Sequence, residues 1–223
     1  MQQLDIIFSD WGGKRDGAGR KPGPNANVPH RRRERHRRGN PVHVTLRARR
    51  GLPPFREQVI AREIRRRIAE TNDSERLREV FRVVHFSVQD NHVHMIVEAL
   101  DGRALSRGVQ GLAIRLARRV NELLGIRGGF WSARFNSREL TAPRSVRNAI
   151  VYVLMNVKKH VARVSDDDFV DPCSSAPWFE GFSHGPSPAR EASPVRAAST
   201  WLASIGWRRH GLIRLDERPR APS

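Results

Sequence analysis

The sequence predicts an α+β fold in which a four-stranded antiparallel sheet carries its helices on one face. Short segments either alternate apolar and polar residues or are rich in apolar residues, as strands are. Other segments carry apolar residues at helical spacing, and glycine, proline or turn-forming residues separate the two kinds. The resulting order is β-α-β-β-α-β-α. Its first six elements are those of a ferredoxin-like, split β-α-β sheet.

The first half of this order is a strand, a helix and a hairpin. Residues 41–49 alternate apolar and polar side chains, as a strand buried on one face requires. A glycine and two prolines end this strand, and apolar residues at helical spacing predict a helix over 55–71. Two apolar-rich runs follow at 80–88 and 92–100. The turn-forming side chains of residues 89–91 predict that these runs pair as an antiparallel hairpin.

The second half is a helix, a strand and a further helix. Apolar residues at helical spacing predict a helix over about 103–124, which ends at a cluster of glycines. Residues 130–140 are predicted as the fourth strand. Pro143 suits the first turn of a helix, where no backbone donor is needed, and this helix is predicted to run to about His160.

The composition points to a polyanionic partner. The chain has 41 Lys and Arg against 23 Asp and Glu, a formal net charge of +18. Such a protein repels itself unless it works beside a polyanion, and nucleic acid is the expected one. Neither a long apolar run nor an apolar N-terminal segment occurs, so we expect no membrane partner and a cytoplasmic, nucleoid-associated protein. The single cysteine, Cys173, excludes an intrachain disulfide and a cysteine-based zinc site.

The distribution of charge, glycine and proline predicts three parts. Residues 1–39 form a basic arm rich in glycine and arginine, which we expect to be disordered and to contact DNA. Within it, residues 19–24 resemble an AT-hook, a segment that lies in the minor groove. Residues 40–165 form one domain, and residues 166–223 form a Pro/Ser-rich extension with a short docked segment that contains tryptophan. The DNA contacts expected in the arm are Arg20, Lys21, Arg31, Arg32, Arg33, Arg35, Arg37 and Arg38.

Two histidines in the third predicted strand are candidate metal ligands. His92 and His94 are two residues apart, so their imidazoles point to the same face of the strand, while Val93 points to the other. Such a pair can hold a divalent metal. A pair of partly exposed histidines that make ordinary hydrogen bonds is the alternative interpretation, and the pair alone does not decide between the two.

The last predicted helix carries a candidate nucleophile. Tyr152 is the only tyrosine in the chain. Asn156 follows four residues later, so in a helix its amide lies one turn away on the same face. Two imidazoles and an amide oxygen leave positions open on Mg²⁺ or Mn²⁺ for a phosphate oxygen, which is the arrangement needed to polarise a phosphodiester beside a nucleophile. A tyrosine of the core remains the alternative.

These motifs resemble the single-tyrosine HUH transposases, and especially the REP-associated tyrosine transposases. The resemblance spans about residues 42–160 and depends on Asp90-Asn91-His92-Val93-His94, Trp131-x-x-Arg134-Phe135 and the helix from Arg147 to Asn156. It implies the HUH endonuclease fold, with His92 and His94 as metal ligands and Tyr152 as the nucleophile. Asn156 takes the place where the family carries Gln or Asn as a further ligand.

The resemblance also implies an activity: a metal-dependent transposase that cuts and rejoins single-stranded DNA, at hairpin-associated sites, through a 5′-phosphotyrosine intermediate. Further DNA contacts are expected from Arg134, Lys158 and Lys159. One alternative is a domesticated, non-catalytic protein that binds nucleic acid on a ferredoxin-like sheet. Another is a metal-dependent phosphoesterase that does not use Tyr152. The sequence leaves the DNA target, the metal and the choice between monomer and homodimer open.

Overall fold

The computed structural model describes residues 36–160, 169–185 and 187–219, except for the side chains of Lys159 and His160. All of them belong to the compact unit of residues 32–223. Arg37 and Arg38 are exposed near the beginning of the described part. The other expected contacts of the basic arm lie outside the described residues, namely Arg20, Lys21, Arg31, Arg32, Arg33 and Arg35.

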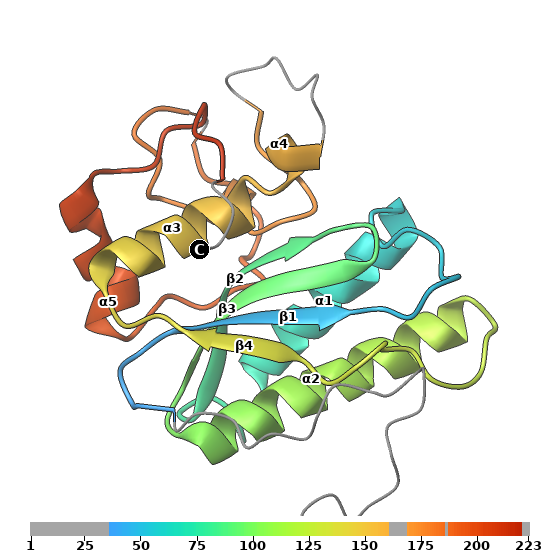
Figure 1. Ribbon diagram of the computed structural model, residues 1–223. Coiled ribbons are helices and arrows are strands. Elements are labelled where there is room, and N and C mark those ends of the chain that lie inside the picture. The colour runs from blue at the N-terminus through green and yellow to red at the C-terminus, as the bar shows by residue number, and fades with distance from the viewer. Residues whose placement is uncertain (1–35, 161–168, 186, 220–223) are drawn as a thin grey trace, which may run out of the picture. The chain divides into compact units, whose positions relative to one another are not determined.

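The centre of the molecule is a four-stranded antiparallel sheet in the order β2-β3-β1-β4 (Figure 1). β1 (Val42–Arg47) lies between β3 (His92–Ala99) and β4 (Asn136–Glu139), and β2 (Phe81–Val88) lies at the edge beside β3. This strand order is the one that a ferredoxin-like sheet requires. The predicted fold class is therefore confirmed.

Two helices cover one face of the sheet. α1 (Gln58–Asp73) and α2 (Gly102–Leu123) bury their apolar sides against alternate residues of the strands (Figure 1). β3 contributes every second residue to this core, beginning at Val93, because successive side chains of a strand point to opposite faces. The largest buried members of the core are Phe55, Phe81, Phe86, Ile60, Ile64, Ile68, Met95, Leu112 and Leu116.

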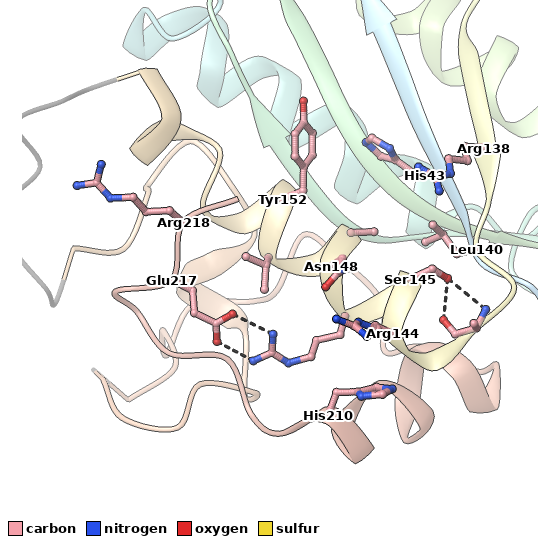
Figure 2. Close-up of a pocket in the computed structure, with 14 residues that line it drawn as sticks. His43, Arg138, Leu140, Arg144, Ser145, Asn148, Tyr152, His210, Glu217 and Arg218 are labelled. Atoms are coloured by element: carbon pink, nitrogen blue, oxygen red, sulfur yellow. Dashed lines mark hydrogen bonds and ion pairs between the residues drawn. The ribbon is translucent and has the colours of Figure 1, made fainter. Parts of the chain in front are cut away.

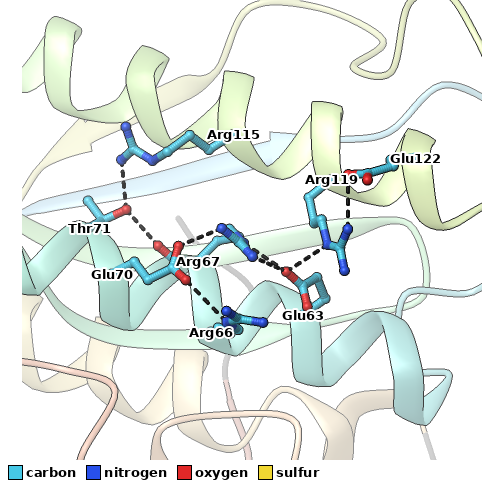
Figure 3. A network of polar contacts seen from close by, with 8 residues as sticks. All are labelled: Glu63, Arg66, Arg67, Glu70, Thr71, Arg115, Arg119 and Glu122. Carbon is cyan, nitrogen blue, oxygen red and sulfur yellow. Dashed lines mark hydrogen bonds and ion pairs between the residues drawn. The ribbon is translucent and has the colours of Figure 1, made fainter.

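Polar contacts link the outer sides of α1 and α2 (Figure 3). Glu63 accepts hydrogen bonds from Arg67 on its own helix and from Arg119 on α2. Arg115 of α2 donates to the hydroxyl of Thr71 on α1, at 2.7 Å. The acidic side chains on these two helices therefore neutralise neighbouring arginines while they hold the helices together.

A second layer covers the opposite face of the sheet. α3 (Pro143–Leu154) packs there with Ile96 of β3. The short elements of the chain's C-terminal part, η1 (Ala176–Trp178), α5 (Trp201–Ser204) and η2 (Gly206–His210), contribute the rest of this layer. Its apolar core is Ile96, Leu140, Val146, Ala149, Ile150, Val151, Val153, Leu154, Met155, Ala176, Ala203, Trp207, Ile213 and Leu215.

Polar contacts bind the described C-terminal residues to this layer. The carboxylate of Glu98 is 4% exposed and accepts hydrogen bonds from the backbone nitrogens and hydroxyls of Ser199 and Thr200. Arg56 makes two hydrogen bonds to the carboxylate of Asp171, at 2.8 and 3.0 Å. The described C-terminal residues are thus part of the folded unit.

Two predicted elements are shorter in the structure than expected. The strand predicted over 130–140 is continuous only over Asn136–Glu139, with one isolated bridge between Trp131 and Ala48 before it. There Phe130 stacks on Phe55, and the Trp131 indole donates to the carbonyl of Ala113. The helix predicted to reach His160 ends at Leu154, and α4 (Val157–His160) follows after a turn. At this turn the backbone nitrogen of Lys158 donates to the carbonyl of Met155, three residues back, so a tighter turn replaces the α-helical hydrogen bonds.

Gly108 of α2 packs against the ring of Phe81, and a Cβ at this position would overlap the ring carbons. We expect Gly108→Ala to lower the free energy of unfolding by about 1–2 kcal/mol, because the steric cost exceeds the gain in helix propensity. At Gly111, in the same helix, a Cβ would meet only the end of the Arg115 side chain, at 3.3 Å. Gly111→Ala should leave stability unchanged or raise it slightly. Urea unfolding measures both, and equal effects would contradict this packing.

Candidate active site

β3 and α3 bring the predicted site residues together from opposite sides. His92 and His94 lie on the face of β3 that α3 covers, with their ring centroids 4.6 Å apart. Tyr152 is on α3, and its ring meets the ring of His94 edge-on, with 5.0 Å between the centroids. Residues 58 positions apart in the sequence thus form one cluster.

His43 completes this cluster and was missed as a site residue in the sequence. It lies on β1, and its Nε2 is 3.2 Å from Nδ1 of His94. The ring centroid of His43 is 5.2 Å from that of His94 and 5.6 Å from that of Tyr152. The alternation of β1 places His43 on the polar face of its strand, but only the pairing of β1 with β3 shows which residues it meets.

Hydrogen bonds fix the ring nitrogens of both predicted ligands. Nδ1 of His92 bonds Oδ1 of Asn91 at 2.7 Å. Nδ1 of His94 lies 3.1 Å from the Thr45 hydroxyl as well as near His43. In both rings Nδ1 is engaged, so Nε2 is the nitrogen that would ligate a metal, supported by outer hydrogen bonds of the kind that orient metal-binding histidines.

Burial changes the titration of the cluster. The pKa of His43 is lowered to about 4, by desolvation first and by the charge of Arg138 second. At neutral pH this imidazole is therefore uncharged. Burial also raises the pKa of the Tyr152 phenol above its usual value of about 10, so the hydroxyl keeps its proton at neutral pH. A reaction that uses this oxygen as a nucleophile has to favour loss of that proton.

Asn156 lies outside the helix that carries Tyr152. Because α3 ends at Leu154, Asn156 belongs to the turn before α4, so the spacing of a continuous helix does not apply to it. Its side chain is fully buried, and neither amide atom has a hydrogen-bond partner among the residues that the structure describes. Such an amide is costly unless something else binds it.

With this geometry established, comparisons with known proteins identify the family. Residues 51–154 match the model of the IS200-like transposases. This segment belongs to the IS200-like transposase family. A solved structure of a REP-associated tyrosine transposase bound to a REP hairpin matches with a TM-score of 0.50 and 20% identity, over 66% of this chain and 82% of that chain. At this identity the match shows a shared fold. No curated protein sequence matches the chain.

The segment matched by the transposase model contains only part of the cluster. His92, His94 and Tyr152 lie inside it, whereas His43 on β1 and Asn156 after α3 lie outside. The short elements η1, α5 and η2 of the C-terminal part lie outside this segment as well. Within the described part of the chain, no helix is long and apolar enough to cross a membrane.

The candidate donors suit a divalent cation without a carboxylate. The described residues hold no group of three or more His, Cys, Asp or Glu side chains that could bind a metal. The candidate ligands are two imidazoles with oriented rings and a buried amide that lacks a protein partner in the described part of the chain. Imidazole nitrogen and amide oxygen together suit a cation such as Mn²⁺.

Three residues expected to contact DNA differ in their surroundings. Arg134 is exposed just before β4. Lys158 is 8% exposed, and its ammonium donates a hydrogen bond to the carbonyl of Leu215. The ammonium of Lys158 therefore points into the protein in this conformation, and we propose no DNA contact for it. The side chain of Lys159 lies outside the described residues.

An open pocket of about 650 Å³ lies beside the cluster (Figure 2). Its walls come from the end of β4, from α3 and from the C-terminal residues 210–218, and it borders both His43 and Tyr152. Four arginines line it, namely Arg138, Arg144, Arg147 and Arg218. Glu217 is the one carboxylate in the lining.

The buried amide of Asn156 generates a stability prediction for the metal-free protein. Leucine has the same branching at Cγ, so Asn156→Leu should raise the free energy of unfolding by about 1–3 kcal/mol, which is the cost of a buried unsatisfied polar group. Asn72 is the matched control, because its buried amide makes hydrogen bonds to Val83 and Pro194. Asn72→Leu should destabilise. Thermal unfolding measures both, and destabilisation by Asn156→Leu would mean that this amide has a protein partner.

Proposed function

We propose that this transposase cuts and rejoins single-stranded DNA, with Tyr152 as the nucleophile and a divalent cation held by His92, His94 and Asn156. One observation carries the proposal: α3 places the only tyrosine of the chain 5.0 Å, between ring centroids, from the imidazole of His94. A tyrosine kept only for packing has no need of two oriented imidazoles beside it. Membership of the IS200-like transposase family supports the same conclusion.

In the proposed reaction, the Tyr152 oxygen attacks the phosphorus of a phosphodiester. The bond from phosphorus to the 3′ oxygen breaks, the phenol loses its proton, and the departing oxygen gains one to become a 3′-hydroxyl. The downstream fragment of the cut strand is then linked to Tyr152 through its 5′ phosphate, as a phosphotyrosine. Attack by a 3′-hydroxyl on this link reverses the step and rejoins DNA, so no water or ATP is consumed.

The residues of the chain prepare this step. His43, His92 and His94 line the place where the phosphate would meet Tyr152. The bound cation would supply a Lewis acid that polarises the phosphate and favours the phenolate. This contribution matters because burial raises the pKa of the phenol.

A strand with a hairpin is the proposed substrate. The solved transposase of the same fold is bound to a REP hairpin, which motivates this choice. The formal charge of +18 supports binding to DNA, and we propose that the basic arm of residues 1–39 and the exposed Arg134 add phosphate contacts.

The proposed chemistry is tested by which part of the cut oligonucleotide becomes linked to the protein. We expect a hairpin-forming oligonucleotide labelled at its 3′ end to give a labelled protein adduct on a denaturing gel, with Mg²⁺ or Mn²⁺ present. The same oligonucleotide labelled at its 5′ end should instead release a free labelled fragment. Tyr152→Phe should bind the oligonucleotide as the wild type does but form neither product, because only the nucleophilic oxygen is removed.

Two results would contradict the proposal. Cutting without an adduct, at the same rate in Tyr152→Phe, would indicate a phosphoesterase that does not use the tyrosine. Tight binding of the oligonucleotide with no cutting by the wild type, whichever divalent cation is added, would favour a protein that only binds nucleic acid.

A further inference from the structure

We propose that the pocket between α3 and the C-terminal residues 210–218 binds the phosphodiester backbone of the single strand that leads to Tyr152. The described C-terminal residues then form one wall of the DNA site. This inference deepens the function proposed above and depends on it for the identity of the ligand. It does not depend on the cutting step.

The position and size of the pocket suit a strand of DNA. Tyr152 and His43 lie at one end, and His210 lies at the other (Figure 2). The volume of about 650 Å³ is in the range of pockets that hold a small organic ligand, about 300–1,000 Å³. Because the pocket is open to solvent and borders Tyr152, a chain can enter it and reach the tyrosine.

The charge of the lining selects an anion. Glu217 makes two hydrogen bonds to Arg147, at 2.6 and 2.9 Å, so this arginine is already neutralised. Arg144 on α3 and Arg218 on the C-terminal segment are exposed and lie on opposite walls. On α1 and α2, by contrast, carboxylates accompany the arginines (Figure 3). Guanidinium groups contributed by two walls of one pocket are suited to phosphate.

Arg147 holds the two walls together. Besides its bonds to Glu217, it donates to the carbonyls of Gly211 and Leu212, each at 3.0 Å. One side chain of α3 therefore makes four hydrogen bonds to the C-terminal segment. This clamp positions Arg218 and His210 beside α3 before any DNA binds.

Neutral polar groups complete the lining. Asn148 is exposed on α3, and Ser145 lies one turn before it. An amide in this position can hydrogen-bond an unpaired base, whereas a paired base presents fewer of its donors and acceptors. The combination of a basic groove with such groups is typical of sites for single strands.

The test compares two pairs of exposed arginines of equal charge. Arg144→Ala/Arg218→Ala removes one arginine from each wall. Arg62→Ala/Arg118→Ala is the control, because these exposed residues lie on α1 and α2, on the opposite face of the sheet. Binding of a fluorescent unpaired oligonucleotide is measured by anisotropy over a series of salt concentrations. All proteins also carry Tyr152→Phe, so that no covalent product forms.

We expect the pocket pair to weaken binding about tenfold more than the control pair. The slope of log affinity against log salt concentration should be smaller in magnitude by about 1.4 for this pair. Each phosphate contact to a single strand contributes about 0.7 to that slope, and two arginines are removed. Equal losses in the two pairs would overturn the proposal. So would an equal loss for blunt duplex DNA, which would assign the pocket to duplex rather than to a single strand. Neither result depends on whether the wild type forms the covalent adduct. The binding experiment can therefore contradict the proposed role of the pocket while the proposed cutting by Tyr152 stands, and the reverse is also possible.

Discussion

The two-residue period of β3 is the constraint on which the rest of the structure depends. Val93, Met95 and Val97 point into the core formed with α1 and α2. His94 and Ile96 point to the other face, where Ile96 anchors α3 and His94 meets Tyr152. A shift of one residue in the register of this strand would exchange the two sets and would remove both the core and the site. The packing that stabilises the fold thus also positions the imidazoles.

The charges are divided between the two faces of the sheet in a similar way. Carboxylates on α1 and α2 neutralise arginines and join the helices, whereas the pocket beside Tyr152 has one carboxylate and four arginines. The C-terminal residues contribute to this asymmetry, because Glu217 binds Arg147 and Arg218 adds a charge. The layer that covers the second face therefore both buries α3 and forms the surface that we assign to DNA.

The sequence predicted the features that depend on local pattern. The order of the elements followed from local pattern, and His92, His94 and Tyr152 were placed correctly in their elements because their neighbours have clear periodicity. Features that depend on contacts distant in the chain were not predictable. His43 joins the cluster only through the pairing of β1 with β3, and Lys158 is buried only because Leu215 returns to accept its hydrogen bond. The early end of α3 was not predicted either, because no glycine or proline marks it in the sequence.

The most direct test of the account is whether a metal held by the histidines lies next to the tyrosine. Because Tyr152 is the only tyrosine, protein labelled with ring-¹³C tyrosine gives the signals of one residue in an NMR spectrum. Mn²⁺, which is paramagnetic, should broaden these signals beyond detection in the DNA-free protein at substoichiometric concentration. His92→Ala/His94→Ala should retain them at the same concentration. Tyrosine signals that persist at saturating Mn²⁺, or that broaden equally in the double variant, would contradict the assignment of the histidines and the tyrosine to one site.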